Sequence, residues 1–306
     1  MYRNLLVPLD GSSFAEHALP LALNIAQRAG ASVRVALVHT PAAGVYGGAE
    51  LAVDPSLDAQ IRDSHKAYLL DALKRLTSAA PMRVTSTLLD GPIADAIHEY
   101  AVASQIDLIV MATHGRGPFS RFWLGSVADR LMRRASVPVL LVRPSAQAPD
   151  FAAKPVLRRL LIPLDGSVLA EQILEPATEL GSLMKAEYTL LRVIEPIVLP
   201  EFTYRGAVTP AWDAATLRKL QTEAQTYLDG VANRLRARSL TVRTQVITNQ
   251  PASIAILEAG KADDIDLIAL ASHGRGGLAR LMLGSVADKV VRGAPTAVLI
   301  HHPPAK

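Results

Sequence analysis

The sequence predicts an α/β protein built from two tandem domains, each an open, doubly wound parallel sheet. Three observations lead to this fold class: a length of 306 residues, an internal repeat, and an alternation of short apolar runs with amphipathic stretches. At about 100–200 residues per domain, this length suits two domains. The chain is 50% hydrophobic and 20% charged, a composition typical of a globular protein with substantial cores.

The repeat covers nearly the whole chain. The segment Asn4–Ser12 recurs 155 residues later as Arg159–Ser167. Farther along, Leu124–Asp129 recurs 159 residues later as Leu283–Asp288. Repeats of this length and order indicate a duplicated domain rather than an array of short structural units.

The two domains are expected at residues 1–146 and 156–303. The segment between them, Pro144–Pro155, is rich in Pro, Ala and polar residues and is typical of a linker. The repeat offset grows by four residues between Pro41 and Tyr68, which indicates an insertion in the second copy. We expect this insertion in a surface loop, where added residues are tolerated.

Each copy alternates strand and helix patterns. The strand patterns are short and rich in Val, Ile and Leu, as expected for strands buried on both faces of a parallel sheet. Their alternation with helices predicts right-handed crossovers. In the first copy we predict strands at 3–9, 32–40, 82–89, 106–112 and 137–143, and helices at 13–29, 57–79, 93–104 and 126–135, with the same order in the second copy. A ligand of such a fold lies beyond the carboxyl ends of the strands, where the strand order reverses.

Composition excludes several classes of protein. The chain has no cysteine, so disulfides, thiolate metal sites and a cysteine nucleophile are excluded. No apolar stretch approaches the roughly 20 residues of a membrane-spanning helix, and the first residues do not have the pattern of a signal peptide. The net charge of +4 is mild and does not single out nucleic acid. We expect a cytoplasmic protein without membrane or nucleic-acid partners.

Two loops are candidates for a binding site. In the loop after the first strand, Asp10 can reach a ligand at the strand end, and Ser12 can cap the following helix. The alternative for this loop is a capped turn and nothing more. The loop from Thr113 to Ser126 follows the fourth strand and is rich in glycine, which lets backbone N–H groups approach a ligand closely.

A helix that opens near Gly125–Ser126 suits a phosphate, because its N-terminus presents N–H donors and partial positive charge. Ser126 can cap this helix or donate its hydroxyl to a phosphate oxygen. The alternative is a glycine-rich turn that happens to precede a capped helix. The second copy repeats the glycine spacing at Gly274 and Gly284. The chain carries neither the P-loop motif G-x-x-x-x-G-K-[ST] nor a G-x-G-x-x-G after its first strand.

Together these residues resemble the universal stress protein family, whose ATP-binding members carry G-x2-G-x9-G-[ST] after the fourth strand. Here Gly115 is followed by nine residues and Gly125-Ser126, and Gly274 by nine residues and Gly284-Ser285. The family's V-P-x-D-G-S opening is also present, and a Gly-Pro pair precedes the third helix. Ala112 and Ala271 stand where the pattern has its first glycine. The resemblance covers nearly the whole chain and implies an adenine nucleotide alpha hydrolase-like fold with five strands per domain.

The resemblance implies an ATP site with Mg²⁺ in each copy. Asp10 and Asp165 would contact the ribose or a metal-bridged phosphate, and Thr40 and Val193 would lie near the adenine. The glycines and serines of the two loops would hold the phosphates. The full set of expected binding residues is Pro8, Asp10, Gly11, Thr40, Met111, Ala112, His114, Gly115, Arg116, Gly125, Ser126, Val127, Pro163, Asp165, Gly166, Val193, Leu270, Ala271, His273, Gly274, Arg275, Gly284, Ser285 and Val286.

Three further features each have two interpretations. His114 and His273 suit a hydrogen bond that positions the loop better than a catalytic base, because no nucleophile accompanies them. Arg121 and Arg280 are equally consistent with pairing to phosphates and with a solvated surface. The long segments after the second strand of each copy suit either a flap over the nucleotide or a partner surface.

The last strands of the two copies, Val137–Arg143 and Thr296–His301, are predicted sheet edges, and apolar edge strands favour pairing. In the universal stress protein family this strand makes the dimer contact. The resemblance therefore implies an intramolecular pseudo-dimer, with a homodimer through another face left open.

The expected function is that of an ATP-binding regulator or nucleotide sensor in the stress response. One alternative is an interaction or scaffold protein that keeps the fold without binding nucleotide, which Ala112 and Ala271 favour. Another is a slow ATP hydrolase. Paired carboxylates and an activated nucleophile are missing from the loops, so at most weak hydrolysis, aided by a metal, is expected.

Overall fold

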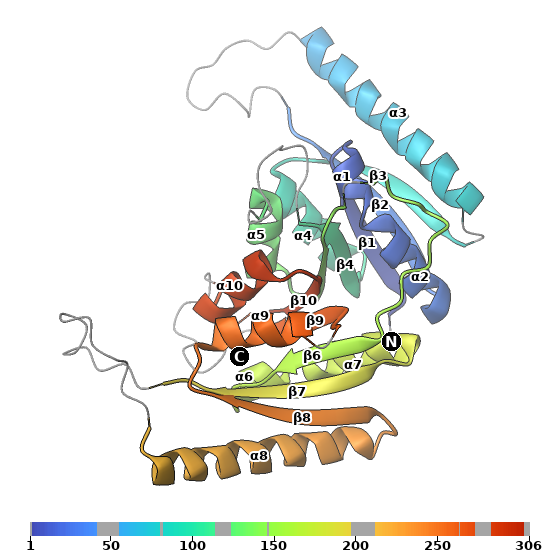
Figure 1. Ribbon diagram of the computed structural model, residues 1–306. Helices are drawn as coiled ribbons and strands as arrows, with labels where there is room; N and C mark the ends of the chain where they lie inside the picture. Colours follow the sequence, from blue (N-terminus) through green and yellow to red (C-terminus); the bar gives the residue numbers. More distant parts are fainter. Residues whose placement is uncertain are drawn as a thin grey trace, which may run out of the picture. The chain divides into compact units, whose positions relative to one another are not determined.

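The computed structural model describes residues 2–41, 55–79, 82–113, 124–145, 147–196, 212–262, 264–272 and 283–302. The chain divides into two compact units, one of Met1–Val156 with Leu299–Lys306 and the other of Leu157–Val298 (Figure 1). Each unit is an α/β domain with a parallel sheet, as the alternating pattern predicted.

In the first unit, the strand order is β3-β2-β1-β4-β5, and all four neighbouring pairs are parallel. The order reverses between β1 and β4, which places the switch point of the sheet there. The strands are β1 Asn4–Leu9, β2 Ser32–His39, β3 Val84–Asp90, β4 Leu108–Ala112 and β5 Val139–Val142, and the helices are α1 Ser13–Glu16, α2 Leu19–Ala29, α3 Pro55–Ala79, α4 Ile93–Ala103 and α5 Ser126–Arg134.

The second unit repeats this arrangement, with the parallel order β9-β6-β7-β8. The switch point lies between β6 and β9. The strands are β6 Arg159–Pro163, β7 Glu187–Ile194, β8 Thr241–Thr248 and β9 Leu267–Ala271, and the helices are α6 Val168–Glu171, α7 Leu174–Met184, α8 Ala214–Arg236, α9 Ala252–Ala262 and α10 Ser285–Gly293. The boundary between the units falls within β10 Ala297–His301, after Val298.

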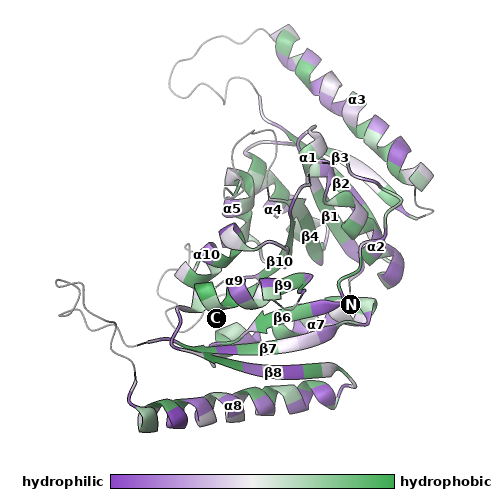
Figure 2. Cartoon of the chain, in the orientation of Figure 1, coloured by the Kyte–Doolittle hydropathy of each residue, from purple (hydrophilic) through white to green (hydrophobic). Residues whose placement is uncertain are grey.

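The core of each unit is formed by the central strands and the helices that cover them. All five residues of β4 and all five of β9 are buried, as expected for strands covered on both faces. The long helices α3 and α8 are amphipathic, and Figure 2 shows hydrophilic and hydrophobic residues alternating along them. Their buried residues lie in the second half of α3 and from Ala224 onward in α8. The residues before Leu69 in α3 and before Ala224 in α8 therefore do not enter the core.

The helix predicted over 13–29 is broken in the structure. It forms the short α1 and then α2, with Pro20 as the second residue of α2. Because proline lacks an N–H group and clashes with the preceding turn, it is tolerated in the first turn of a helix and not in its interior. The second unit has the same break between α6 and α7. Within the described part of the chain, no helix is both long and apolar enough to span a bilayer.

Candidate functional site

The loop after β1 holds the Asp10 carboxylate in a fixed place. Asp10 Oδ1 accepts hydrogen bonds from Ser12 N at 2.9 Å and from Ser12 Oγ at 2.6 Å. Ser12 Oγ in turn accepts from Ala15 N at 3.2 Å, so Ser12 is the N-cap of α1. Gly11 takes φ +85°, a left-handed conformation that favours glycine. The capped turn is thus present, and it anchors Asp10 at the carboxyl end of the sheet.

The second unit repeats this turn. Asp165 Oδ1 accepts from Ser167 N at 2.9 Å and from Ser167 Oγ at 2.6 Å, and Gly166 takes φ +83°. Ser167 Oγ accepts from Ala170 N at 3.1 Å. Each unit therefore holds one carboxylate at the strand end beside the switch point.

The helix after β4 begins without a side-chain cap. Gly125 is its N-cap, with φ −61° and ψ 146°, and no side chain accepts from the first N–H groups. The Gly125 N–H donates to the Thr113 carbonyl at 2.9 Å, which keeps Gly125 extended and makes Ser126 the first helical residue. Of the two roles suggested for Ser126, the structure excludes capping, and donation of its hydroxyl to a phosphate stays a prediction. A helix N-terminus left without a side-chain cap keeps N–H donors for a ligand.

The corresponding helix of the second unit, α10, starts in the same way. Gly284 is its N-cap and has no side-chain cap bond. Its N–H donates to the Ser272 carbonyl at 2.8 Å. The same local structure thus arises twice from the same Leu-Gly-Ser-Val-Ala-Asp segment.

A cavity of about 520 Å³ lies at this edge of the first unit. Its walls come from β1, β2, β4, α3, α4 and α5, so it lies across the switch point. Gly11 is the described binding candidate of this unit that does not line it. The candidates that do are Pro8, Asp10, Thr40, Met111, Ala112, Gly125, Ser126 and Val127.

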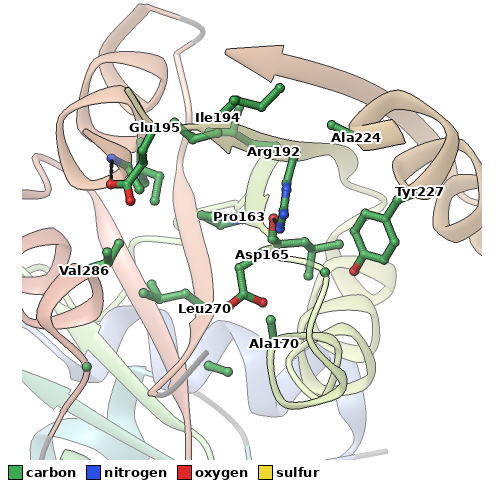
Figure 3. Close-up of a pocket in the computed structure, with 18 of the residues that line it drawn as sticks. Pro163, Asp165, Ala170, Arg192, Ile194, Glu195, Ala224, Tyr227, Leu270 and Val286 are labelled. Atoms are coloured by element: carbon green, nitrogen blue, oxygen red, sulfur yellow. Dashed lines mark hydrogen bonds between the residues drawn. The ribbon is translucent and has the colours of Figure 1, made fainter. Parts of the chain in front are cut away.

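The second unit has a larger cavity, of about 900 Å³, in the same place (Figure 3). Both volumes fall in the roughly 300–1,000 Å³ range of small-molecule sites. Figure 3 shows Arg192 extending from β7 toward Asp165, with Tyr227 on one side and Glu195 on the other. The candidates that line this cavity are Pro163, Asp165, Gly166, Val193, Leu270, Ala271, Gly284, Ser285 and Val286.

The structure thus gathers the described candidates of each copy, except Gly11, around one cavity, and their roles in binding stay predictions. Six candidates lie outside the described residues, namely His114, Gly115, Arg116, His273, Gly274 and Arg275. The same holds for Arg121 and Arg280 and for most of the long segments after β2 and β7.

Thr40 and Val193 both line their cavities but are not counterparts. The strand register pairs Pro8 with Ala36 and Pro163 with Leu191, so the 155-residue offset persists through β2 and β7. At this offset Thr40 corresponds to Glu195. Glu195 and four more lining residues of the second unit, Arg192, Trp212, Glu223 and Tyr227, were missed by the sequence analysis.

A buried carboxylate behind the Asp10 loop was also missed. The Glu16 side chain is 8% exposed and pairs with Arg75 of α3, with contacts of 2.7 Å and 2.9 Å between the guanidinium nitrogens and the two carboxylate oxygens. Tyr68 Oη donates to Glu16 Oε1 at 2.9 Å. Burial and the Glu16 carboxylate raise the pKa of Tyr68 far above its usual range, so its hydroxyl stays protonated as the donor.

The second unit repeats this cluster. Tyr227 Oη donates to Glu171 Oε1 at 3.0 Å, and Arg234 contacts Glu171 Oε2 at 2.5 Å. Burial and Glu171 likewise raise the pKa of Tyr227 well above its usual range. The recurrence of Glu, Tyr and Arg in both copies is the sequence signal that could have found the cluster. In both units the cluster ties the long helix to the short helix that follows the carboxylate loop.

The left-handed glycine of the carboxylate loop gives a stability prediction. Gly166→Ala should destabilise the second unit by about 1 kcal/mol or more, because an L-residue is strained at φ +83°. Calorimetry of the full chain should show this as a lower unfolding temperature for one unit. The matched control is Gly230→Ala in α8, where an added Cβ has no heavy atom within 4 Å, and which should stabilise the helix by up to about 1 kcal/mol. Equal effects of the two substitutions would contradict the prediction.

Comparison with known proteins places this repeat in a family. The model of the Universal stress protein family matches residues 1–143 and 157–302. A universal stress protein of Mycobacterium tuberculosis is 26% identical over 317 residues, which cover 97% of this chain and 94% of that protein. One from Mycobacterium bovis is 28% identical over 203 residues, which cover 65% of this chain and only 63% of that relative.

Solved structures agree on the fold. The crystal structure of a universal stress protein from Archaeoglobus fulgidus matches with a TM-score of 0.67 and 19% identity, and the match covers 98% of this chain and 96% of that one. The two regions matched by the family model follow each other along the chain, as the internal repeat does. The chain belongs to the universal stress protein family and carries two tandem copies of its domain.

Proposed function

We propose that each unit binds ATP in its cavity, and that the protein acts as a cytoplasmic stress-response regulator or nucleotide sensor. The observation that carries this proposal is the glycine N-cap at the switch point of both sheets. Gly125 and Gly284 start helices whose first N–H groups have no side-chain cap, and both glycines line a cavity. Such a helix start favours an anionic phosphate.

The residues around the cavity fit a nucleotide laid across β1. A phosphate at Ser126 would accept from backbone N–H groups and from the Ser126 hydroxyl. Because β2 lies on the other side of β1 from β4, the rest of the ligand would extend past Asp10 toward the end of β2. Asp10 would then contact the ribose or a phosphate-bound Mg²⁺.

Mg²⁺ would be held mainly by the nucleotide in this arrangement. The described residues contain no group of three or more His, Asp or Glu side chains able to hold a metal ion. Mg²⁺ commonly binds through one or two carboxylates together with substrate phosphates, and Asp10 and Asp165 each supply one carboxylate. The ion would neutralise phosphate charge beside these side chains.

Isothermal titration of the full chain with Mg·ATP should show micromolar-range affinity, corresponding to about −8 kcal/mol, at one or two sites. Asp10→Asn combined with Asp165→Asn should weaken binding, with a larger loss in the presence of Mg²⁺ than in its absence. An absence of binding at millimolar ATP would contradict the proposal. That outcome would favour the scaffold function, for which Ala112 and Ala271 in the cavity walls are the supporting observation.

We also propose that the last strands of the two copies, at 137–143 and 296–301, pair within one chain, as the family resemblance implies. The chain has no cysteine, so a disulfide between two introduced cysteines can be detected without interference from native ones. One cysteine in each of these strands should form an intramolecular disulfide on mild oxidation, because bridged Cα atoms must lie within about 7 Å. Exclusively intermolecular bridges would contradict this pairing.

A further inference from the structure

The two cavities are alike at one end and different at the other. At the phosphate end, each unit has the same residue types: Asp10 or Asp165, an alanine at the end of β4 or β9, and the Gly-Ser-Val start of α5 or α10. The differences lie around the ends of β2 and β7 and on the helices beside them. If phosphates bind at the helix start, as proposed above, these differences surround the base.

In the first unit this end has mostly apolar lining residues. Ile61 of α3, Ile93 of α4 and Leu37 of β2 line it, together with His65 of α3. Thr40 Oγ1 donates to the Gly91 carbonyl at 3.2 Å. Of the described residues that line this cavity, Asp10 is the one with a carboxylate, and it lies at the end of β1.

In the second unit two of the side chains at this end are smaller. The 155-residue and 159-residue offsets place Ala224 where the first unit has His65, and Ala252 where it has Ile93. The loss of these two large side chains accords with the increase in cavity volume from about 520 Å³ to about 900 Å³. At the 155-residue offset, Arg192 also takes the place of Leu37.

Two groups without a counterpart of the same type in the first unit are held in place at this end. Trp212 Nε1 donates to the Glu195 carbonyl at 2.9 Å, which holds the indole at the end of β7. Glu195 Oε1 accepts from Ala252 N at 2.8 Å, which holds the carboxylate at the start of α9. Both residues line the cavity. An aromatic side chain and a carboxylate that line one cavity are suited to a flat base that donates hydrogen bonds.

The chemistry of the purines distinguishes two ligands at this point. Guanine has an exocyclic amino group next to a ring N–H, so two donors face the same way, whereas adenine has its amino group next to a ring nitrogen that accepts. A carboxylate only accepts hydrogen bonds, and each remaining lone pair favours a donor. We infer that the second unit binds guanine nucleotides in preference to adenine nucleotides, and that the first unit, whose described lining has no carboxylate at this end, lacks this preference.

This inference rests on the proposed function. One set of titrations tests nucleotide binding and nucleotide preference separately. In the full chain, Gly125→Phe leaves only the second cavity open, and Gly284→Phe leaves only the first. Each variant is titrated with Mg·ATP and Mg·GTP. The ratio of GTP affinity to ATP affinity should be at least about tenfold higher for the second cavity, as expected when a site is built to accept hydrogen bonds from one ligand.

Glu195→Gln tests the carboxylate directly. Glutamine keeps an oxygen that can accept from Ala252 N, but it presents an N–H₂ donor toward the donors of guanine. GTP affinity should therefore fall by about tenfold or more while ATP affinity holds or rises. The control is Glu187→Gln, at the other end of β7, where the side chain is exposed and outside the cavity.

The outcomes are distinguishable. Absence of binding for both nucleotides at both cavities would overturn the proposed function and this inference with it. Binding of ATP at both cavities with equal GTP-to-ATP ratios would leave the proposed function standing and overturn this inference alone. A Glu195→Gln variant that loses no GTP affinity would overturn the role of the carboxylate and thereby the inference.

Discussion

Gly284→Phe is expected to abolish nucleotide binding in the second unit, by more than about 100-fold, and to leave the affinity of the first unit unchanged. Gly284 lines the cavity and lies at the N-terminus of α10. A phenyl ring at this position would occupy the space next to the N–H groups that we propose bind phosphate. Its φ of −57° and ψ of 146° are extended values that any residue adopts, so the substitution does not strain the backbone.

The measurement is the stoichiometry of nucleotide binding by isothermal titration, which should lose the site of the second unit. Gly125→Phe is the reciprocal variant and should remove the site of the first unit. An added Cβ at Gly125 lies 3.3 Å from the Thr113 carbonyl oxygen, so circular dichroism and unfolding temperature must accompany that titration. Unchanged stoichiometry in both folded variants would show that phosphates do not bind at these helix starts.

The fold could be predicted because local patterns and the repeat agreed with each other. Buried strands such as Leu108–Ala112 have no polar residue, and each is followed by an amphipathic helix. The break between α1 and α2 was missed although Pro20 signalled it. The residues around this break are apolar enough to continue the helical pattern. The spacing of apolar residues carries no information about the backbone N–H group that Pro20 lacks.

The phosphate end of the site was easier to predict than the base end. Asp10 and Gly125 belong to short segments that are contiguous in sequence and repeated almost unchanged. Trp212, Glu195 and Ala252 come from three different parts of the second copy, and they meet only because β7 ends beside the start of α9. Their types also differ from those in the first copy. Such residues are found by aligning the two copies and asking where lining positions change size or charge.

The N-cap of α5 shows a limit of reading residue types alone. Serine is a common N-cap, and Ser12 and Ser167 do cap their helices. Ser126 does not, because the bond from Gly125 N to the Thr113 carbonyl makes the preceding glycine the last extended residue. A long-range backbone contact of this kind has no signature in the local sequence.

Arg75→Met is expected to cost the first unit about 2 kcal/mol or more of unfolding free energy. The substitution leaves the Glu16 carboxylate, which is 8% exposed, without its cation. Breaking a fully buried pair costs about 3–5 kcal/mol, and the value here is lower because the Arg75 side chain is 40% exposed. Arg75 also lies over the Phe151 ring, 5.2 Å from its centroid, so its loss loosens the contact with the segment after β5.

Calorimetry of the full chain should show a fall of about 4–8 °C in the unfolding temperature of the first unit, at roughly 2–4 °C per kcal/mol. The matched control is Lys66→Met on the same helix, which removes an exposed pair with Asp63 and should change stability by no more than about 0.5 kcal/mol.

The double variant Glu16→Met with Arg75→Met separates charge from packing. Replacing a buried pair by apolar side chains of similar size is often neutral, so the double variant should recover most of the stability lost in Arg75→Met. Failure to recover would show that packing of the arginine, rather than the uncompensated carboxylate, carries the effect.

Because α3 also supplies Ile61 and His65 to the cavity wall, the Arg75→Met variant should bind ATP more weakly at the first unit alone. A loosened α3 no longer holds that wall in place, whereas the Glu171 cluster of the second unit keeps α8 fixed.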